Sequence, residues 1–309
     1  MYQYEPSPEL LFHLDGKTAI ITGSARGIGA ATATLFTKYG CNVVITDLPS
    51  LQGQAASLIE SLEHPQRAIF VPASITAWDD LRGVFKKGIK TFGKIDIVVA
   101  NAGIMESKAV LEVAVDENDD PVESAEANRV IDVNLKGTMN TLRLSMHYMS
   151  RNAPSSDGFR GSIVLIASTS GYFGSTSNAA YIASKHGVVG LLRASQQLAT
   201  SQQVRINAIA PSFTPTYITS GFGESVQKAG LEANTPEMVG TAVACAALDT
   251  DRQGTCCLVA GKFLRELENT QQDLMPDWLG SDLLESMARL GAILKDLGGY
   301  PLPPESAKI

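Results

Sequence analysis

Short runs of β-branched and other apolar residues alternate along the chain with longer stretches in which apolar residues recur at helical spacing. The continuous apolar character of the short runs is typical of strands that are buried on both faces of a sheet. The predicted strands are residues 17–22, 41–47, 68–72, 94–100, 161–167, 204–210 and 255–260. The helical stretches between them include residues 27–40, 51–63 and 124–149. This alternation predicts right-handed βαβ units, and therefore an α/β fold with a doubly wound parallel sheet of seven strands and helices on both faces.

The chain of 309 residues is long enough for two domains, but α/β folds of this size are routinely one. We find no internal repeat, low-complexity tract or linker, and we expect a single domain over residues 1–309 with a core from about 14 to 262. An acidic stretch at 116–126 is predicted to be an exposed loop before the helix at 124–149.

A C-terminal extension from about residue 265 to 309 carries apolar residues on one helical stripe. The stripe consists of Leu283, Leu284, Met287, Leu290, Leu294 and Leu297. We expect it to pack on its own domain or across a dimer interface. The alternative is that it helps to close a substrate pocket.

Charge and composition exclude several classes of partner. The net charge of −7 argues against nucleic acid or an anionic membrane surface, and no apolar run approaches the ~20 residues of a membrane-spanning helix. The first residues lack a secretory-signal pattern, and the four cysteines form neither a C-x-x-C motif nor a cluster with histidine. We therefore expect a cytoplasmic protein with no metal site and no disulfide framework. The ending Ala307–Ile309 is similar to a peroxisomal address, which leaves peroxisomal import as an alternative.

The stretch "TGSARGIG" follows the first predicted strand and opens the first predicted helix. Glycines at this position permit a tight turn and a close approach of the backbone to a pyrophosphate, which the helix N-terminus also attracts. The sequence therefore predicts a dinucleotide site. The cofactor contacts expected in this turn are Gly23, Ser24, Arg26, Gly27, Ile28 and Gly29.

Asp47 ends the second predicted strand, at the position where a carboxylate can accept hydrogen bonds from the adenosine ribose and repel a 2′-phosphate. This residue favours NAD as the cofactor. Arg26 favours NADP instead, because a guanidinium can pair with that phosphate. Beside Asp47 we expect Arg26 to be a solvated loop residue, and NAD remains the prediction.

Tyr181 and Lys185 are four residues apart in "NAAYIASKHGVVG", so they share one face of a helix. A neighbouring ammonium is expected to lower the pKa of a phenol from about 10 toward neutral pH, where a general acid–base works best. Ser168 follows the fifth predicted strand and can stabilise charge on a reacting oxygen. Each residue alone has an ordinary structural explanation, as a surface pair or a turn residue. Their occurrence together after a dinucleotide turn favours catalysis.

"TGSARGIG", "ANAG" at 100–103, Asn134 in "VNLKG", Ser168 and the Tyr181–Lys185 pair resemble the short-chain dehydrogenase/reductase family in order and spacing. The resemblance covers about residues 14 to 262 and is closest to NAD-dependent alcohol dehydrogenases. It implies a Rossmann-type seven-stranded sheet and a homodimer or homotetramer built on the long helices. It also implies hydride transfer between a nicotinamide and a carbonyl or secondary alcohol.

The same resemblance assigns roles to single residues. It implies that Tyr181 is the proton donor and acceptor, that Lys185 also binds the nicotinamide ribose, and that Asn134 holds a water connected to Lys185. The further cofactor contacts that it implies are Asn101, Ala102, Gly103, Ser74, Ile75, Pro211, Thr214 and Thr216. Two departures from the family pattern weaken the expected affinity for the cofactor. Ser212 stands where glycine is usual, and Ser74 stands where aspartate is common.

The substrate is a small molecule that the sequence does not identify. Residues 213–226 are predicted to form a mobile lid. The aromatic and apolar residues expected either to line a lipophilic pocket or to pack on the core are Phe213, Tyr217, Ile218, Phe222, Tyr172 and Phe173. We expect a lipophilic secondary alcohol or ketone, such as a secondary metabolite, prostanoid or steroid.

Two other functions remain open. One is an epimerase or dehydratase of the related extended group, although these usually have T-G-x-x-G-x-x-G and a larger C-terminal domain. The other is a non-catalytic dinucleotide-sensing regulator, in which Tyr, Lys or Ser would typically be lost.

Overall fold

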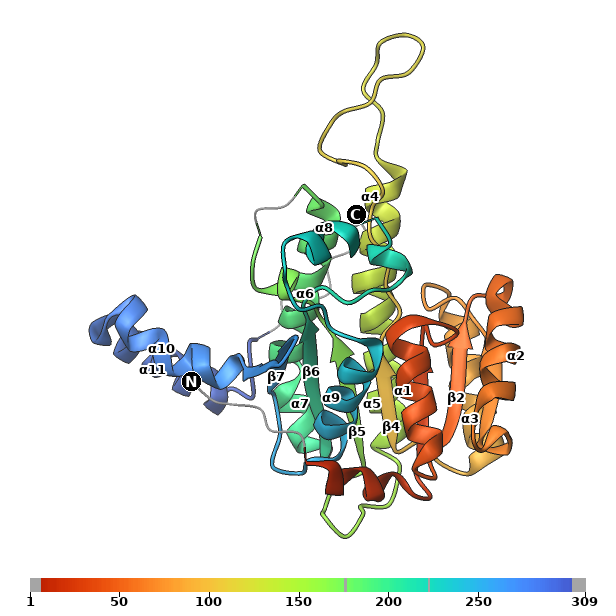
Figure 1. The fold of residues 1–309 in the computed structure, drawn as a ribbon. Coiled ribbons are helices and arrows are strands. Elements are labelled where there is room, and N and C mark those ends of the chain that lie inside the picture. Colours follow the sequence, from red (N-terminus) through yellow and green to blue (C-terminus); the bar gives the residue numbers. More distant parts are fainter. Residues whose placement is uncertain (1–6, 175–176, 222, 302–309) are drawn as a thin grey trace.

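A computed structural model of the protein describes residues 7–174, 177–221 and 223–301. Its centre is an eight-stranded sheet with the strand order β3-β2-β1-β4-β5-β6-β7-β8 (Figure 1). The strands are β1 Thr18–Thr22, β2 Asn42–Asp47, β3 Ala68–Pro72, β4 Ile97–Ala100, β5 Gly161–Ile166, β6 Val204–Pro211, β7 Cys256–Ala260 and β8 Phe263–Glu266. All neighbouring strands pair in parallel except β7 and β8.

The predicted doubly wound α/β fold is confirmed, but the predicted number of seven strands is wrong. The additional strand, β8, turns back after Gly261 and pairs antiparallel with β7. It is only four residues long and contains an arginine and a glutamate, so it lacks the apolar run that identifies a buried strand. The expected end of the core at about residue 262 therefore falls between two paired strands.

Helices cover both faces of the sheet, and each face has its own apolar core. On one face lie α1 (Gly27–Lys38), α2 (Gln52–Ser61) and α9 (Pro236–Leu248). The other face is covered by α3 (Trp78–Phe92), α5 (Thr138–Met149) and α6 (Ala179–Ala194). The remaining α-helices are α4 Ala125–Ile131, α7 Gln196–Ser201, α8 Gly223–Lys228, α10 Glu268–Leu279 and α11 Ser281–Asp296. The central strands β1, β4, β5 and β6 are almost fully buried between these layers, which explains their continuous apolar sequences.

The helix predicted over 124–149 is interrupted. α4 ends at Ile131, and a π-helical segment, η4 (Asp132–Gly137), connects it to α5. A π-helical turn widens the helix locally and is found frequently at functional sites. Asn134 lies in this segment with no exposed surface.

The strand order reverses between β1 and β4, because the chain first runs from β1 outward to β3 and then returns to the other side of β1. Loops on either side of such a reversal leave a crevice at the carboxyl ends of the strands, where α/β sheets bind ligands. The turn after β1 and the segment after β4 both lie at this edge. The loop 107–124 also leaves this edge and projects from the body (yellow in Figure 1), and its acidic part is exposed as predicted.

The C-terminal extension stands apart from the sheet and its covering helices (blue in Figure 1). No described residue of α11 is buried, and Leu290 of the apolar stripe is 52% exposed. The expectation that the stripe packs on its own domain is therefore wrong for the described part of the chain. A dimer interface remains a prediction. Phe222 and Ala307–Ile309 lie outside the described residues.

Further expectations concern the cysteines and the membrane. All four cysteines are buried free thiols, and Cys41 and Cys245 lie in the core. Among the described residues, no helix is both long and apolar enough to cross a membrane.

One buried carboxylate holds the start of the extension on the sheet. Glu266, at the end of β8, is 2% exposed and accepts hydrogen bonds from the backbone N–H groups of Cys256, Glu268 and Asn269. It thereby joins β7 to the first turn of α10, whose amides have no helical acceptor.

We predict that Glu266→Ala lowers the free energy of unfolding by roughly 1–3 kcal/mol, because it leaves several buried N–H groups without an acceptor. Urea denaturation followed by circular dichroism measures this change. Limited proteolysis should show earlier cleavage near residue 268. Glu285→Ala, at an exposed position of α11, is the control and should change the stability by less than about 0.5 kcal/mol. Equal stability of the two variants would contradict the anchoring role.

Candidate active site

The glycine turn after β1 is pressed against the end of β4. A Cβ at Gly23 would lie 2.7 Å from the Cα of Ala102, and one at Gly29 would lie 2.5 Å from the carbonyl oxygen of Gly23. Gly23 also has a φ of 65°, a conformation that side-chain-bearing residues rarely adopt. Backbone proximity therefore requires glycine at both positions.

Asn101 fixes this contact from the β4 side. Its Nδ2 donates to the carbonyl oxygens of Thr22 (2.8 Å) and Gly23 (2.9 Å). In return, the hydroxyl of Thr22 accepts hydrogen bonds from the N–H groups of Asn101 and Ala102, both at 3.0 Å. The side chain of Asn101 thus serves the shape of the turn. Thr22 is a site residue that the sequence analysis missed, because a threonine inside an apolar strand reads as an ordinary strand residue.

Asp47 lies beside the glycine turn as expected. Its carboxylate accepts hydrogen bonds from the N–H groups of Ala25 (3.1 Å) and Leu48 (2.9 Å), which fix it at the end of β2. Ser24 has its hydroxyl turned inward, where it donates to Ile21 O (2.6 Å) and accepts from Thr46 N (3.1 Å). Asp47 therefore presents a fixed negative charge to a ligand at this turn, whereas Ser24 can contact such a ligand only through its backbone.

Arg26 is exposed, but it is not simply solvated. Its guanidinium stacks 3.9 Å from the ring centroid of Tyr217, a residue of the predicted lid. Arg26 is also the N-cap of α1, and its side chain makes no capping bond, so the first-turn N–H groups after Gly27 lack a side-chain acceptor. Such a helix start attracts an anion.

Ser168, Tyr181 and Lys185 come together at the same edge of the sheet. Ser168 follows β5, and its Oγ accepts a hydrogen bond from Ser170 N at 3.1 Å. Tyr181 and Lys185 lie on α6, with the Lys185 Nζ 5.6 Å from the centroid of the Tyr181 ring. Lys185 is 5% exposed and donates to the carbonyl oxygen of Ile166 at 2.8 Å. The three predicted catalytic residues therefore lie close together at this edge of the sheet.

The electrostatics of the pair differ from the expectation. Burial raises the pKa of Tyr181 and the negative charge of Glu106 raises it further, while hydrogen bonding with the Ser168 side chain lowers it. Burial also lowers the pKa of Lys185 to about 8. The expected lowering of the Tyr181 pKa by Lys185 is therefore wrong for this structure. The reason is that Lys185 points to Ile166 O and that both groups are removed from water.

Asn134 supports the cluster from η4. Its Oδ1 accepts from Ile104 N and its Nδ2 donates to Ile104 O, both at 2.8 Å, so one side chain clamps the segment after β4. The Nδ2 also donates to the hydroxyl of Ser184 (3.0 Å), which in turn donates to Tyr181 O (2.7 Å). A Cβ at Gly103 would lie 3.3 Å from Asn134 Oδ1, so Gly103 allows this close approach.

The remaining predicted cofactor contacts lie in two segments. Ser74 bonds its neighbour Thr76 (2.8 Å between hydroxyls), and Ile75 packs so tightly on Gly137 that a Cβ there would lie 2.5 Å away. After Pro211, the hydroxyl of Thr214 donates to Ser212 O at 3.0 Å, and Thr216 caps a short helical turn.

The sequence analysis missed Asn234. It is 1% exposed, its Nδ2 donates to Thr214 Oγ1 (3.1 Å) and Val259 O (2.9 Å), and its Oδ1 accepts from Gly261 N (2.7 Å). It thereby holds the segment after β6 against β7. A single asparagine before a helix start gives no sequence signal for this long-range role.

The predicted pocket-lining residues do not form one group. Tyr172 is directed to the C-terminal extension, where its hydroxyl donates to Glu268 at 2.7 Å. Phe173 and Tyr217 are 60% and 70% exposed, whereas Phe213 and Ile218 are partly buried. Tyr172 therefore anchors the extension rather than presenting its hydroxyl to a pocket.

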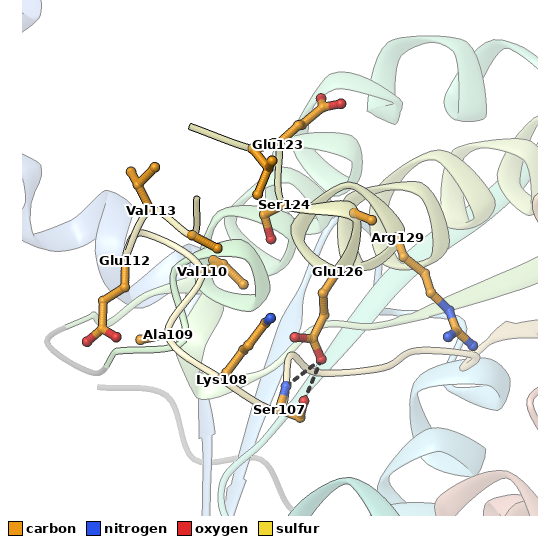
Figure 2. Close-up of a pocket in the computed structure, with 13 residues that line it drawn as sticks. Ser107, Lys108, Ala109, Val110, Glu112, Val113, Glu123, Ser124, Glu126 and Arg129 are labelled. Carbon is orange, nitrogen blue, oxygen red and sulfur yellow. Dashed lines mark hydrogen bonds between the residues drawn. The ribbon is translucent and has the colours of Figure 1, made fainter. Parts of the chain in front are cut away.

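A hollow of about 810 Å³ lies between the loop after Glu106 and the start of α4 (Figure 2). Figure 2 shows Ser107 at its base, where its N–H (2.7 Å) and its hydroxyl (2.8 Å) both donate to Glu126 Oε1. The charged residues that line it are Lys108, Glu112, Glu123, Glu126 and Arg129. Ser168, Tyr181 and Lys185 do not line this hollow.

The arrangement of these residues fits a dinucleotide. Close packing at Gly23 and Gly29, the uncapped start of α1 and the fixed carboxylate of Asp47 together form a narrow site for a phosphate-linked nucleoside. Within the ranges that the structure describes, no group of histidine, cysteine and acidic residues could hold a metal ion.

Comparisons with known proteins agree with this site. The family model described as short chain dehydrogenase matches residues 17–227. The short-chain dehydrogenase/reductase prx4 of Penicillium roqueforti is 33% identical over 286 residues, which are 86% of this chain and 81% of that protein. The 3-hydroxyacyl-CoA dehydrogenase type-2 of Drosophila melanogaster is 34% identical over 209 residues, with 68% of this chain and 79% of that protein covered.

A solved structure gives the same result. The crystal structure of 3-hydroxyacyl-CoA dehydrogenase type-2 from Mycobacterium avium superposes with a TM-score of 0.70 at 29% identity, and the match covers 80% of this chain and 96% of that one. With the glycine turn, Asn134, Ser168, Tyr181 and Lys185 in one site, and with more than half of its length matched, the chain belongs to the short-chain dehydrogenase/reductase family.

Proposed function

We propose that the protein is an NAD-dependent oxidoreductase that interconverts a secondary alcohol and a ketone. The observation that carries this proposal is the convergence of Ser168, Tyr181 and Lys185 beside the glycine turn. The three residues come from two elements, and only the folded sheet brings them to one edge. If the sequence matched these motifs only by chance, the three side chains would not have to lie close together in the folded protein.

The dinucleotide, when bound, supplies the hydride acceptor or donor. The Tyr181 hydroxyl gives a proton to the carbonyl oxygen of the substrate in reduction, or its phenolate takes the proton from the alcohol in oxidation. The Ser168 hydroxyl donates a hydrogen bond to the same oxygen and stabilises negative charge on it. Lys185 carries its charge at neutral pH, since its pKa of about 8 lies above 7, and donates to Ile166 O beside Tyr181. Asn134 keeps the main chain around Tyr181 in place through Ile104 and Ser184.

The raised pKa of Tyr181 supports reduction as the direction at neutral pH, because the phenol is then the protonated form that donates. A lipophilic substrate is supported by the exposed aromatic rings near the site, Phe173 and Tyr217. The charged residues of the hollow in Figure 2 are mixed in sign and give no concentrated positive surface for a phosphorylated substrate. The presence of all catalytic side chains argues against a sensing regulator.

The first test is a panel of lipophilic secondary alcohols and ketones, together with 3-hydroxyacyl-CoA thioesters, since some relatives are named for that activity. We expect NAD(H)-dependent absorbance change at 340 nm with the lipophilic compounds. Tyr181→Phe should lower kcat/KM by about 10²–10⁴-fold while the affinity for NAD stays unchanged, because the ring remains and only the hydroxyl that transfers the proton is lost. Tight NAD binding without turnover of any compound would support the sensing alternative.

The second prediction concerns cofactor choice. Asp47→Asn keeps an oxygen that can accept from Ala25 N but removes the negative charge that repels a 2′-phosphate. We expect the ratio of kcat/KM for NAD over NADP to fall by at least about tenfold, which corresponds to roughly 1.4 kcal/mol. Arg26→Ala is the matched variant, and it should raise the same ratio or leave it unchanged. A wild-type protein that prefers NADP would contradict the role given to Asp47.

The third prediction is a pH dependence. Burial lowers the pKa of Lys185 to about 8, so its positive charge is present below that pH and is lost as the pH rises through it. Tyr181 stays protonated over this range because its own pKa is raised. Reductive kcat/KM should therefore be level from neutral pH to about 8 and decline above it. Lys185→Arg, which keeps its charge throughout, should be slower but should not show this decline.

A further inference from the structure

Glu106 is a buried carboxylate that the proposed mechanism does not use. It lies in the segment between β4 and the projecting loop and is 7% exposed. One of its oxygens accepts from Ala180 N at 2.9 Å, and the other accepts from Tyr181 N at 3.1 Å. These are first-turn amides of α6, which find no acceptor inside their own helix.

The residue at the N-cap of α6 does not provide this capping. Asn178 makes no side-chain capping bond, and its amide donates to the sulfur of Met105 at 3.3 Å. A carboxylate from a distant part of the chain thus takes the place of an N-cap side chain. Negative charge is favourable at a helix N-terminus, both for the macrodipole and as a charge-assisted acceptor of N–H groups.

Glu106 is itself held in a fixed frame. Two residues before it, Ile104 is clamped on both its N–H and its carbonyl oxygen by Asn134. The next residue, Ser107, is bonded twice to Glu126 of α4, as Figure 2 shows. Ile104 thus attaches the segment to η4, Glu106 attaches it to α6, and Ser107 attaches it to α4. Glu106 therefore connects the base of the projecting loop to the helix that carries Tyr181.

We propose that Glu106 is a positioning residue for the reaction at Tyr181, because its carboxylate holds the first turn of α6 in place. This inference rests on the proposed function. The carboxylate of Glu106 accepts a hydrogen bond from the main-chain N–H of Tyr181. A shift of this carboxylate would therefore also move the Tyr181 side chain. Its negative charge also opposes ionisation of the phenol and raises the pKa of Tyr181.

Other charged groups lie on α6 and on the elements packed against it, and most of them have partners other than Tyr181. They are Lys185, His186 and Arg193 on α6, Glu126 and Arg129 on α4, and Asp132 and Lys136 on η4. Lys185 bonds Ile166 O, Arg193 pairs with Glu268, Asp132 pairs with Lys136, and Glu126 is held by Ser107. Glu106 is the charged neighbour that raises the pKa of the Tyr181 phenol.

The test compares Glu106→Gln, which keeps an acceptor of nearly the same shape and removes the charge, with Glu106→Ala, which removes both. In the oxidative direction we expect Glu106→Gln to move the midpoint of the kcat/KM profile to lower pH by at least about half a unit. Glu106→Ala should in addition lower kcat by about tenfold with little change in KM, because α6 loses its cap. Glu106→Gln should restore most of that kcat.

Glu126→Gln is the matched control, since Glu126 holds the same segment through Ser107, and its hydrogen bonds join it to Ser107 and not to the first turn of α6. Its pH profile should coincide with that of the unmodified protein. Unchanged profiles in both Glu106 variants would overturn the proposal. If Glu106→Gln does not fold, Glu106→Asp replaces it, and this variant should keep the pH midpoint while lowering kcat.

A readout without turnover separates this proposal from the proposed function. The phenolate of Tyr181 absorbs near 295 nm, and the difference between each protein and its Tyr181→Phe version isolates its titration. Glu106→Gln should shift this titration to lower pH even if no alcohol in the panel is oxidised. Silence of the panel with a shifted titration would reject the substrate class alone. An unshifted titration would reject the role of Glu106.

Discussion

The contact between Gly23 and Ala102 is the constraint on which the site depends. A single added carbon at Gly23 would lie 2.7 Å from the Cα of Ala102, so the turn after β1 and the end of β4 are as close as two backbones can be. The reversal of strand order brings these two segments together, and Asn101 and Thr22 lock them with reciprocal hydrogen bonds. The contact lies between the glycine turn, which is proposed to bind the cofactor, and the segment after β4, which Asn134 joins to α6.

Buried or fixed carboxylates provide a second common principle. Asp47, Glu106 and Glu266 each accept backbone N–H groups where an element starts or a turn begins. Main-chain donors at such places need an acceptor, and a carboxylate has room for several. In each case the charge is thereby fixed in space. At Asp47 the fixed charge lies beside the glycine turn, and at Glu106 it lies at the main chain of Tyr181.

Sequence predicted the fold well because strands that are buried on both faces must be continuously apolar, as Val43–Ile45 and Val98–Ala100 are. It also predicted which catalytic residues meet, since their spacing resembles that of a family. It did not predict β8, whose pattern is short and polar, or the π-helical turn at Asn134. Glu106 and Asn234 were missed because their partners are distant in sequence and no local pattern reports them.

The sequence also could not give the sign of the Tyr181 pKa shift, and this sign follows from packing. A lysine one turn away lowers the pKa of a phenol only if its charge is directed at the oxygen and little solvation has been lost. Here Lys185 is buried and directed to Ile166 O, and Tyr181 is partly buried. The packing that brings Ser168, Tyr181 and Lys185 together therefore also disfavours ionisation of Tyr181 and raises its pKa. The raised pKa favours the protonated form of Tyr181, which is the form that the proposed reduction of a ketone would need.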